Sequence, residues 1–339
     1  PKPSSAASDV YKRQAQLFTT TNHQWILFFT NMGRVYRTKV WQLPEAGRDA
    51  KGGHVAGLLS FLPDEKIAQV MTLRSYEDAE YLLLATRKGM VKKTALKAYD
   101  SSRQAGVIAI NFRTDDDELI GAEQCSAADD VLLISRKGQA IRFSAGDDQL
   151  RAMGRATSGV TGMKFRDDDE LLSMSIIHSD MPEDDRFVFT ATDGGYAKRS
   201  AVSQYRQQGR GGLGIKAMAL NEERGSLVGG LVVSEADEII AIKSSGQITR
   251  SAVSEVPAKG RSTMGVKFVS VRGGDAVSII ALNPEQAVDE DVSEEPVENV
   301  EGDAAHSEPG DVLLQSDIVD GDRAVDTAES EMEPEDNGE

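Results

Sequence analysis

One unit recurs five times along this chain of 339 residues, and it limits the fold more than any other feature. An apolar run of about four residues leads to a glycine, and the fourth residue after that glycine is basic. The copies lie at residues 25–38, 81–94, 131–143, 187–200 and 239–251. A repeat of roughly 50 residues that contains strand-like segments predicts a radial or stacked β architecture.

Each unit continues in the same way. A polar loop leads to a second glycine and a short apolar segment, and then an acidic or glycine-rich turn precedes a further apolar segment. We expect strands at 54–59, 107–112, 160–165, 215–220 and 266–271, and again at 67–73, 119–124, 171–177, 227–233 and 277–282. Four strands per period predict an all-β fold of propeller blades, in which radial closure protects the sheet edges. A lone segment, 17–21, has the place of the last strand of an earlier, incomplete blade.

The net charge of −17 has a local source. Residues 283–339 hold 21 acidic residues and one basic residue, which leaves 37 basic and 34 acidic residues in the first 282. We therefore expect a mildly basic folded body and a disordered acidic tail at 283–339. General solubility is one role for that tail, and competition with a polyanion for the cationic body is the sharper hypothesis. Residues 1–14 match no repeat and are predicted to be a foreign or linker segment.

No catalytic or metal-binding constellation is apparent. Cys125 is the single cysteine, and the four histidines lack the spacing of zinc ligands. The acidic clusters 115–118 and 167–170 fall where the repeat requires turns, and they lack the interleaved spacing of a calcium loop. Glycines 209, 211 and 214 have the spacing of a dinucleotide fingerprint, but a strand-like segment follows them where that motif needs a helix.

The basic residue of each unit is the main functional signal. Cations at one register in five units predict a positive belt that binds phosphates, although solvated edge strands carry similar charges. We expect this belt to contain Arg34, Arg37, Lys39, Arg48, Lys51, Lys92, Lys93, Arg103, Arg142, Arg155, Lys198, Arg199, Arg210, Arg250, Lys259 and Arg261.

With this repeat and these motifs, the chain resembles the family of C-terminal domains of the DNA gyrase A protein. The likeness extends over residues 15–282, and its clearest motifs are 33–36 with 39–44, 89–94 and 151–154. The resemblance implies a six-bladed β-pinwheel, here with one blade incomplete, that wraps duplex DNA at its rim. It also implies that the chain is a non-catalytic part of an ATP-dependent type II topoisomerase. That enzyme would act in the bacterial cytoplasm, at the chromosome. Its partners would be the gyrase A N-terminal region and the gyrase B protein, in a tetramer of two A and two B subunits. The fragment itself would carry no cofactor, since ATP and magnesium belong to the other domains.

Family members carry a glycine-rich and basic heptapeptide in the first blade, which tight wrapping requires. The segment most similar to it here lies in the fourth unit and comprises Gln208, Gly209, Arg210, Gly211, Gly212 and Gly214. It lacks two of the basic positions. We expect a flexible loop in which backbone amides and Arg210 contact phosphate.

Two alternatives stay open. The corresponding domain of the topoisomerase IV A protein, which selects DNA substrates for decatenation, is a smaller and broken propeller. A propeller that scaffolds other proteins is possible as well, because this architecture hosts many functions. Binding that weakens steeply with salt would favour a DNA wrapper over a scaffold.

Overall fold

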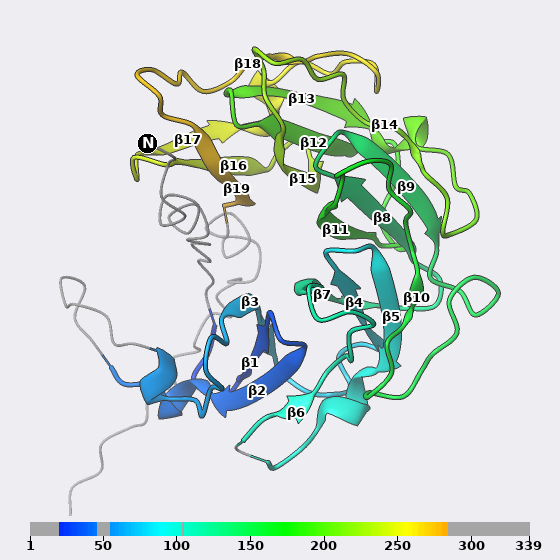
Figure 1. Ribbon diagram of the computed structural model, residues 1–339, viewed down its shortest axis with the longest axis vertical. Helices are drawn as coiled ribbons and strands as arrows, with labels where there is room; N and C mark the ends of the chain where they lie inside the picture. Colours follow the sequence, from blue (N-terminus) through cyan, green and yellow to red (C-terminus); the bar gives the residue numbers. More distant parts are fainter. Residues whose placement is uncertain (1–19, 46–54, 104, 284–339) are drawn as a thin grey trace, which may run out of the picture. The chain divides into compact units, whose positions relative to one another are not determined.

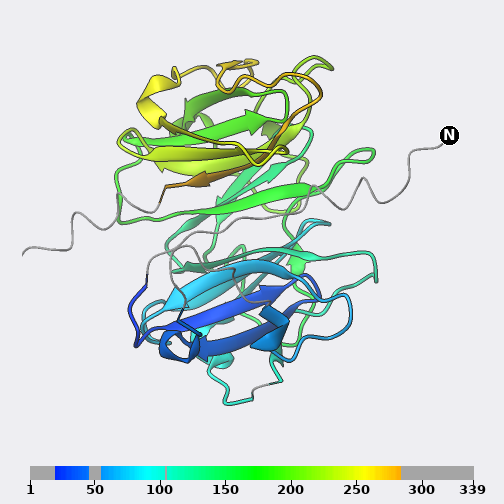
Figure 2. The ribbon, with the colours of Figure 1, turned by 90° about the vertical axis from the view of Figure 1, so that its left-hand side faces the viewer.

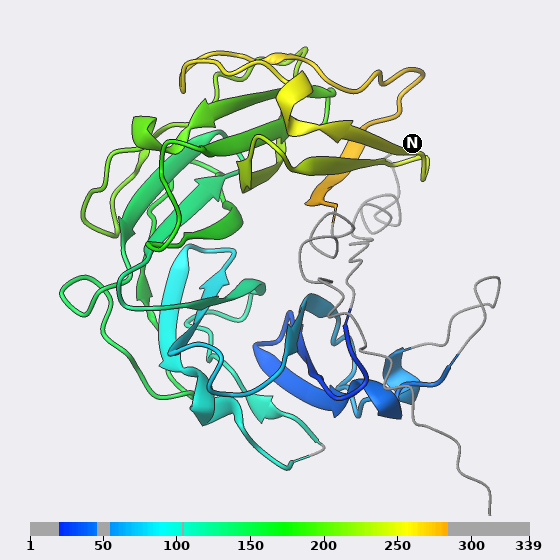
Figure 3. The ribbon, with the colours of Figure 1, turned by 180° about the vertical axis from the view of Figure 1, so that it is seen from behind.

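The computed structural model describes residues 20–45, 55–103 and 105–283. The chain divides into two compact units, Pro1–Val292 and Ser293–Glu339, and the second lies outside the described residues. Within the first unit, five antiparallel sheets follow one another in chain order (Figure 1). Figures 2 and 3 show the same sheets from the side and from behind.

Each sheet contains a hairpin whose turn holds the recurring glycine. The hairpins are β1 (Trp25–Thr30) with β2 (Arg34–Lys39), β4 (Tyr81–Thr86) with β5 (Met90–Ala95), β8 (Asp130–Ser135) with β9 (Gln139–Ser144), β12 (Arg186–Thr192) with β13 (Tyr196–Ala201), and β16 (Glu238–Lys243) with β17 (Ile248–Ala252). A third strand pairs with the first strand of each hairpin. These inner strands are β3 (Ile67–Leu73), β7 (Leu119–Cys125), β11 (Leu171–Ile177), β15 (Leu227–Ser234) and β19 (Val277–Leu282).

The fourth strand of a sheet comes from the following repeat. After each hairpin the chain forms a short 3-10 turn or a loop, and from the second repeat onward it then crosses back to the preceding sheet. The 3-10 turns are η3 (Val40–Gln42), η5 (Leu96–Tyr99), η6 (Val202–Gln204) and η7 (Val253–Glu255). The outer strands are β6 (Val107–Ile108) on β2, β10 (Val160–Thr161) on β5, β14 (Ile215–Lys216) on β9 and β18 (Val266–Lys267) on β13. Strand exchange between consecutive repeats is therefore the organising feature of the fold.

The structure corrects four expectations. The second-glycine segments are strands of two residues in the neighbouring sheet, whereas we expected longer strands in their own blade. Residues 54–59 were predicted to form a strand, but Val55–Gly57 forms the 3-10 turn η4, because no preceding sheet in the described residues offers it a partner. The described chain has five blades and not six, and its last sheet has three strands. In the predicted lone strand 17–21, Thr20 and Thr21 are not in a strand, and the rest lies outside the described residues.

The hydrophobic core lies between successive sheets. One cluster joins the first two sheets through Leu27, Phe29, Leu82 and Leu84, and three further clusters fill the next three junctions. A fifth cluster, which includes Leu59, covers the remaining face of the first sheet. Because every junction buries large apolar side chains from both neighbours, each sheet is stabilised mainly by the sheets before and after it.

Candidate functional site

The structure places most of the repeated basic residues inside the protein. Lys92, Lys93 and Lys198 have no exposed surface, and Arg199 is 8% exposed. The side chains of Arg37 and Arg142 are 17% and 13% exposed. The expectation that these six residues form a surface belt is therefore corrected. Strand alternation predicts one free face, but β5 and β13 are buried on both faces because the loop of the following repeat crosses over them.

In the first four hairpins, the cation four residues after the hairpin glycine links its sheet to the next repeat. Lys93 Nζ donates to the Ala145 carbonyl at 2.6 Å and to Asp147 Oδ1 at 2.9 Å. Arg199 Nε donates to the Val256 carbonyl at 2.8 Å. The pairings of Arg37 with Asp100 at 2.5 Å and of Arg142 with Glu183 at 2.5 Å follow the same pattern. The ammonium of Lys93 holds the pKa of the Asp147 carboxyl below its usual range through this hydrogen bond and its charge.

An aromatic ring supports three of these cations from within the same hairpin. Arg37 lies 4.3 Å from the ring centre of Trp25, Lys93 lies 4.4 Å from that of Tyr81, and Arg199 lies 4.6 Å from that of Phe187. Such contacts strengthen when the cation is desolvated. The recurring basic position of the hairpins therefore has a structural role, because its side chains join consecutive repeats.

A second series of cations lies on the surface. Arg155, Arg210 and Arg261 each precede the second glycine of their repeat by four residues. The Arg155 guanidinium donates to the carbonyl of Ile108 at 2.9 Å, that of Arg210 to Thr161 at 3.1 Å, and that of Arg261 to Lys216. The three acceptors are equivalent, because each is the second residue of an outer strand. Three consecutive outer strands therefore each carry an arginine on their edge, and each guanidinium keeps donors for a further acceptor.

We call the outer strands and the loops before them the outer rim, which comprises residues 96–103, 105–108, 145–161, 202–216 and 253–267. Its charge is strongly one-sided. The rim holds ten basic residues, namely Lys97, Arg103, Arg151, Arg155, Arg206, Arg210, Lys216, Lys259, Arg261 and Lys267. Its four acidic residues are Asp100, Asp147, Asp148 and Glu255, and the first two already pair with Arg37 and Lys93. Such a row of cations suits a linear polyanion.

The other predicted cations lie in several places. Arg103 and Lys259 are exposed on the rim, as expected, and Arg250 is exposed on β17. Arg34 donates to the Ala105 carbonyl at 2.6 Å, next to the rim. Lys39 Nζ donates to the His23 carbonyl at 2.8 Å and covers the Trp25 ring. Arg48 and Lys51 lie outside the described residues.

The glycine-rich loop 208–214 belongs to the rim of the third sheet, but it uses its amides internally. The amide of Gln208 donates to the Arg142 carbonyl at 2.9 Å, and that of Gly211 donates to the Gly162 carbonyl at 2.6 Å. The expectation that backbone amides of this loop face phosphate is therefore wrong at these two positions, whereas Arg210 remains at the surface. Strand β14 follows the loop, so the helix that a dinucleotide site requires is missing here.

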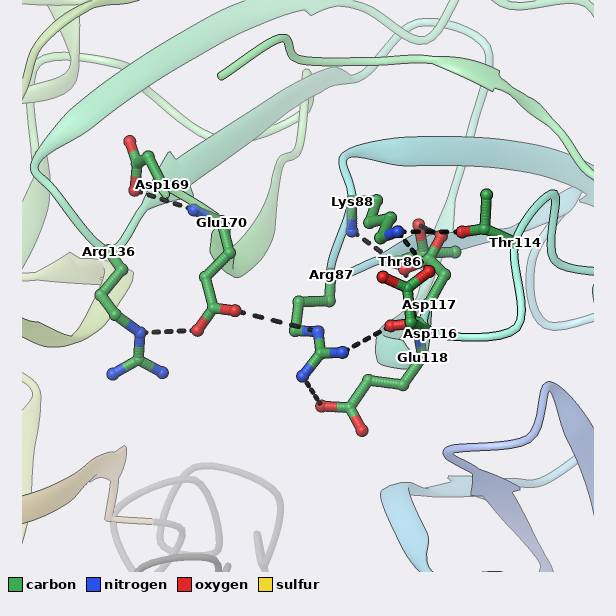
Figure 4. Close-up of polar contacts among 10 residues, drawn as sticks. All are labelled: Thr86, Arg87, Lys88, Thr114, Asp116, Asp117, Glu118, Arg136, Asp169 and Glu170. Carbon is green, nitrogen blue, oxygen red and sulfur yellow. Dashed lines mark hydrogen bonds and ion pairs between the residues drawn. The ribbon is translucent and has the colours of Figure 1, made fainter. Parts of the chain in front are cut away.

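The acidic clusters form turns, as predicted, and they pair with the hairpin turns beside them (Figure 4). Glu170 accepts from Arg136 at 2.8 Å and lies 3.8 Å from Arg87, which also lies 3.3 Å from Glu118. Asp117 is buried and accepts from the Thr86 hydroxyl at 2.7 Å. Within the described ranges, no group of histidine, cysteine and carboxylate side chains is placed to hold a metal ion.

Sequence reasoning missed several rim cations. Arg151, Arg206, Lys216 and Lys267 are exposed on the same loops and strands, but they were not among the predicted residues. A signal was present, because Arg151 and Arg206 each lie eight residues before the second glycine of their repeat, and Lys216 and Lys267 each lie two residues after it. This pattern lies in loops and two-residue strands, so it was harder to recognise than the cation four residues after each hairpin glycine, which lies in a regular strand.

The described residues contain no helix that is long and apolar enough to cross a membrane. A family profile described as "DNA gyrase C-terminal domain, beta-propeller" matches residues 24–74, 80–126, 129–178, 186–234 and 237–283, one match for each sheet. The DNA gyrase A protein of Streptomyces coelicolor is 58% identical over 86% of this chain, and that of a Nocardioides strain is 52% identical over 93%. The chain spans 33% and 38% of the length of these two relatives.

Two solved structures share the fold. One is described as the C-terminal domain of DNA topoisomerase IV, with a TM-score of 0.69 over 82% of this chain and 86% of that one. The other is described as a DNA gyrase A C-terminal domain, with a TM-score of 0.65 over 78% and 83%. Both are 24% identical to this chain, so they support the architecture alone. The profile that matches all five repeats, together with the gyrase relatives, places this chain in the family of DNA gyrase A C-terminal domains.

Proposed function

We propose that residues 15–282 bind duplex DNA without reading its sequence and bend it along the outer rim. The observation that carries this proposal is the row of Arg155, Arg210 and Arg261 on equivalent carbonyls of successive outer strands. A guanidinium held at a fixed place by one hydrogen bond meets a phosphate with little further loss of side-chain entropy. Arginines repeated from sheet to sheet would meet phosphates at intervals, and these contacts would offset the elastic cost of bending.

We propose that the chain acts as part of gyrase, because its similar relatives are DNA gyrase A proteins. DNA wrapped on the rim would be presented to the strand-passage gate of the gyrase A protein, and ATP hydrolysis on the gyrase B protein would drive negative supercoiling in a tetramer of two A and two B subunits. In this role the chain wraps the DNA, and the other domains cleave DNA and bind ATP and magnesium. It would act at the bacterial chromosome.

The test measures the affinity for a linear duplex of mixed sequence over a series of salt concentrations. Replacing the three rim arginines by alanine should lower the slope of log affinity against log salt by about one for each phosphate that is no longer bound. Arg166→Ala is the matched control, because Arg166 is exposed on the turn before β11 and away from the rim sequence. Equal salt slopes for the triple variant and the native chain would refute the rim as the DNA-binding surface.

Wrapping is tested separately from binding. A plasmid relaxed by a nicking-closing enzyme in the presence of the chain should show a shift in linking number, and the triple variant should not show that shift. Retained binding without any shift would leave a passive DNA-binding module and refute chiral wrapping.

A further inference from the structure

Two lysines are buried without a carboxylate partner in the described part of the chain. Lys92 in β5 and Lys198 in β13 both follow their hairpin glycine by three residues, and neither has exposed surface. No described ion pair includes either of them. A buried ammonium is costly unless it is fully hydrogen-bonded, so these side chains must be held by other acceptors.

The acceptors are main-chain carbonyls, and in each case one belongs to a rim arginine. Lys92 Nζ donates to the carbonyl of Arg155 itself and to that of Ala109. Lys198 Nζ donates to the carbonyl of Arg261 and, at 2.9 Å, to that of Gly260. The same geometry therefore recurs in two sheets that lie two repeats apart. In each case the lysine binds the backbone of the arginine, and the arginine side chain reaches the neighbouring outer strand.

The charges of the two groups are coupled. Burial, and after it the Arg155 guanidinium, lowers the pKa of Lys92 to about 7. Burial, and after it Arg261, lowers the pKa of Lys198 to about 8. Each lysine thus stands close enough to its arginine for the two cations to repel each other, and the carbonyl bonds keep them together.

The third sheet shows that packing alone does not require a lysine at this position. Ile141 occupies the same register in β9 and is fully buried. The corresponding loop is held in another way, since Arg210 Nε donates to the Gln149 carbonyl at 2.6 Å and the Gly211 amide to that of Gly162. An apolar side chain therefore fits this register in the third sheet, where the loop is held without a lysine.

We propose that Lys92 and Lys198 are positioning residues for DNA binding, which fix Arg155 and Arg261 on the rim without touching DNA. This inference rests on the proposed function of the rim. A hydrogen bond to the carbonyl of the arginine restricts the backbone from which its side chain projects, so the guanidinium is pre-organised for a phosphate. Removal of the ammonium should leave the arginine present but mobile.

A double-mutant cycle in the full chain tests this. Lys92→Met should weaken duplex binding by about threefold to tenfold, and the same substitution in an Arg155→Ala background should cost nothing further. Ile141→Met is the matched control, since it puts the same side chain at the same register and should leave binding unchanged. Lys198→Met with Arg261→Ala repeats the cycle in another sheet and replaces the first cycle if Lys92→Met does not fold.

The outcomes are distinct. An equal loss from Lys92→Met in both backgrounds would mean a general structural effect and would overturn the inference. The inference is also overturned if Lys92→Met folds and binds DNA like the native chain while Arg155→Ala binds more weakly. If Arg155→Ala and Arg261→Ala both leave binding and its salt slope unchanged, the rim assignment itself is wrong and the inference fails with it.

Discussion

Arg155 Nη1 donates to the carbonyl of Ile108 at 2.9 Å, across 47 residues of sequence. This bond joins the loop of the third repeat to an outer strand that belongs to the first sheet. The position of the guanidinium therefore depends on three consecutive repeats. The same arginine connects repeats and belongs to the outer rim. Substitutions can therefore test its effect on DNA binding separately from its effect on stability.

The first prediction concerns a single rim arginine. Arg210→Ala should weaken duplex binding uniformly across DNA sequences and reduce the salt slope by about one. The physical reason is that one phosphate keeps its condensed counterions when the guanidinium is absent, while the fold keeps its core. Anisotropy titrations with duplexes of different composition measure both quantities. A change that depends on base sequence would contradict a contact made to phosphate alone.

The second prediction concerns the bond between Lys93 and the following repeat. Lys93→Ala should lower the free energy of unfolding by about 2–3 kcal/mol, because it removes a carbonyl hydrogen bond and a cation–π contact from a buried site. Asp147→Ala should cost much less, because Asp147 is the exposed partner and its charge is screened by solvent. Urea unfolding measures both. Equal losses would mean that the ion pair, and not the buried carbonyl bond, joins the repeats.

The third prediction concerns pH. The pKa values of Lys92 and Lys198 are about 7 and about 8 in the folded chain, against 10.5 for an ordinary lysine. Between the pKa of the folded chain and that of an ordinary lysine, the unfolded chain binds more protons than the folded one. The free energy of unfolding should therefore rise with pH in this range. Well below pH 7 both states are fully protonated and this contribution is constant.

The measurement is the urea midpoint between pH 7 and pH 9, below the titration of Tyr99, whose pKa burial raises to about 12. Lys92→Met should flatten the rise, while Ile141→Met should leave it unchanged. A midpoint that falls with pH in the native chain would contradict the lowered lysine pKa values.

The fourth prediction compares two equivalent hairpin glycines. Both have a positive φ, +81° at Gly195 and +84° at Gly246. A Cβ on Gly195 would lie 2.1 Å from the Val269 carbonyl oxygen, whereas a Cβ on Gly246 would meet nothing within 4 Å. Gly246→Ala should therefore cost about 1–2 kcal/mol from backbone strain alone, and Gly195→Ala should cost more. Equal costs would show that the approach of the segment after β18 does not restrict this turn.

The fifth prediction concerns the acidic tail, which lies outside the described residues. If residues 283–339 compete with DNA for the rim, a chain that ends at Leu282 should bind duplex more tightly at low salt, and the gain should shrink as salt screens the charges. A tail of equal length in which neutral residues replace Asp and Glu is the control. Unchanged affinity at low salt would discard the competition.

The sequence predicted local structure well. The hairpin glycines, the inner strands and the acidic turns were all found from apolar runs and turn residues, and β3, β11 and β19 have the expected bounds. The partner of each second-glycine segment was not predictable in this way, because strand exchange is a pairing between repeats that no local period reveals. Residues 55–57 illustrate this, since they form a 3-10 turn and no preceding sheet in the described part of the chain pairs with them.

The candidate site was predicted only in part. Recurrence predicted Lys93 and Arg199 on the surface belt, but a period in sequence does not distinguish a surface cation from one covered by a crossing loop. That covering depends on the path of the next repeat, which runs parallel to β5 at Ala152 and to β13 at Ala258. Arg155, Arg210 and Arg261 were among the predicted residues, but the equivalent carbonyls that they bind on successive outer strands were not predictable from the sequence.

Strand exchange also has consequences for synthesis and for evolution. A blade cannot be completed on the ribosome until the next repeat has emerged, so assembly of the domain must lag behind translation by one repeat. Because the donated strand meets its acceptor in the same way at β2, β5, β9 and β13, the loss or duplication of a whole repeat recreates an equivalent junction. Lineages can therefore change the number of blades without inventing a new interface.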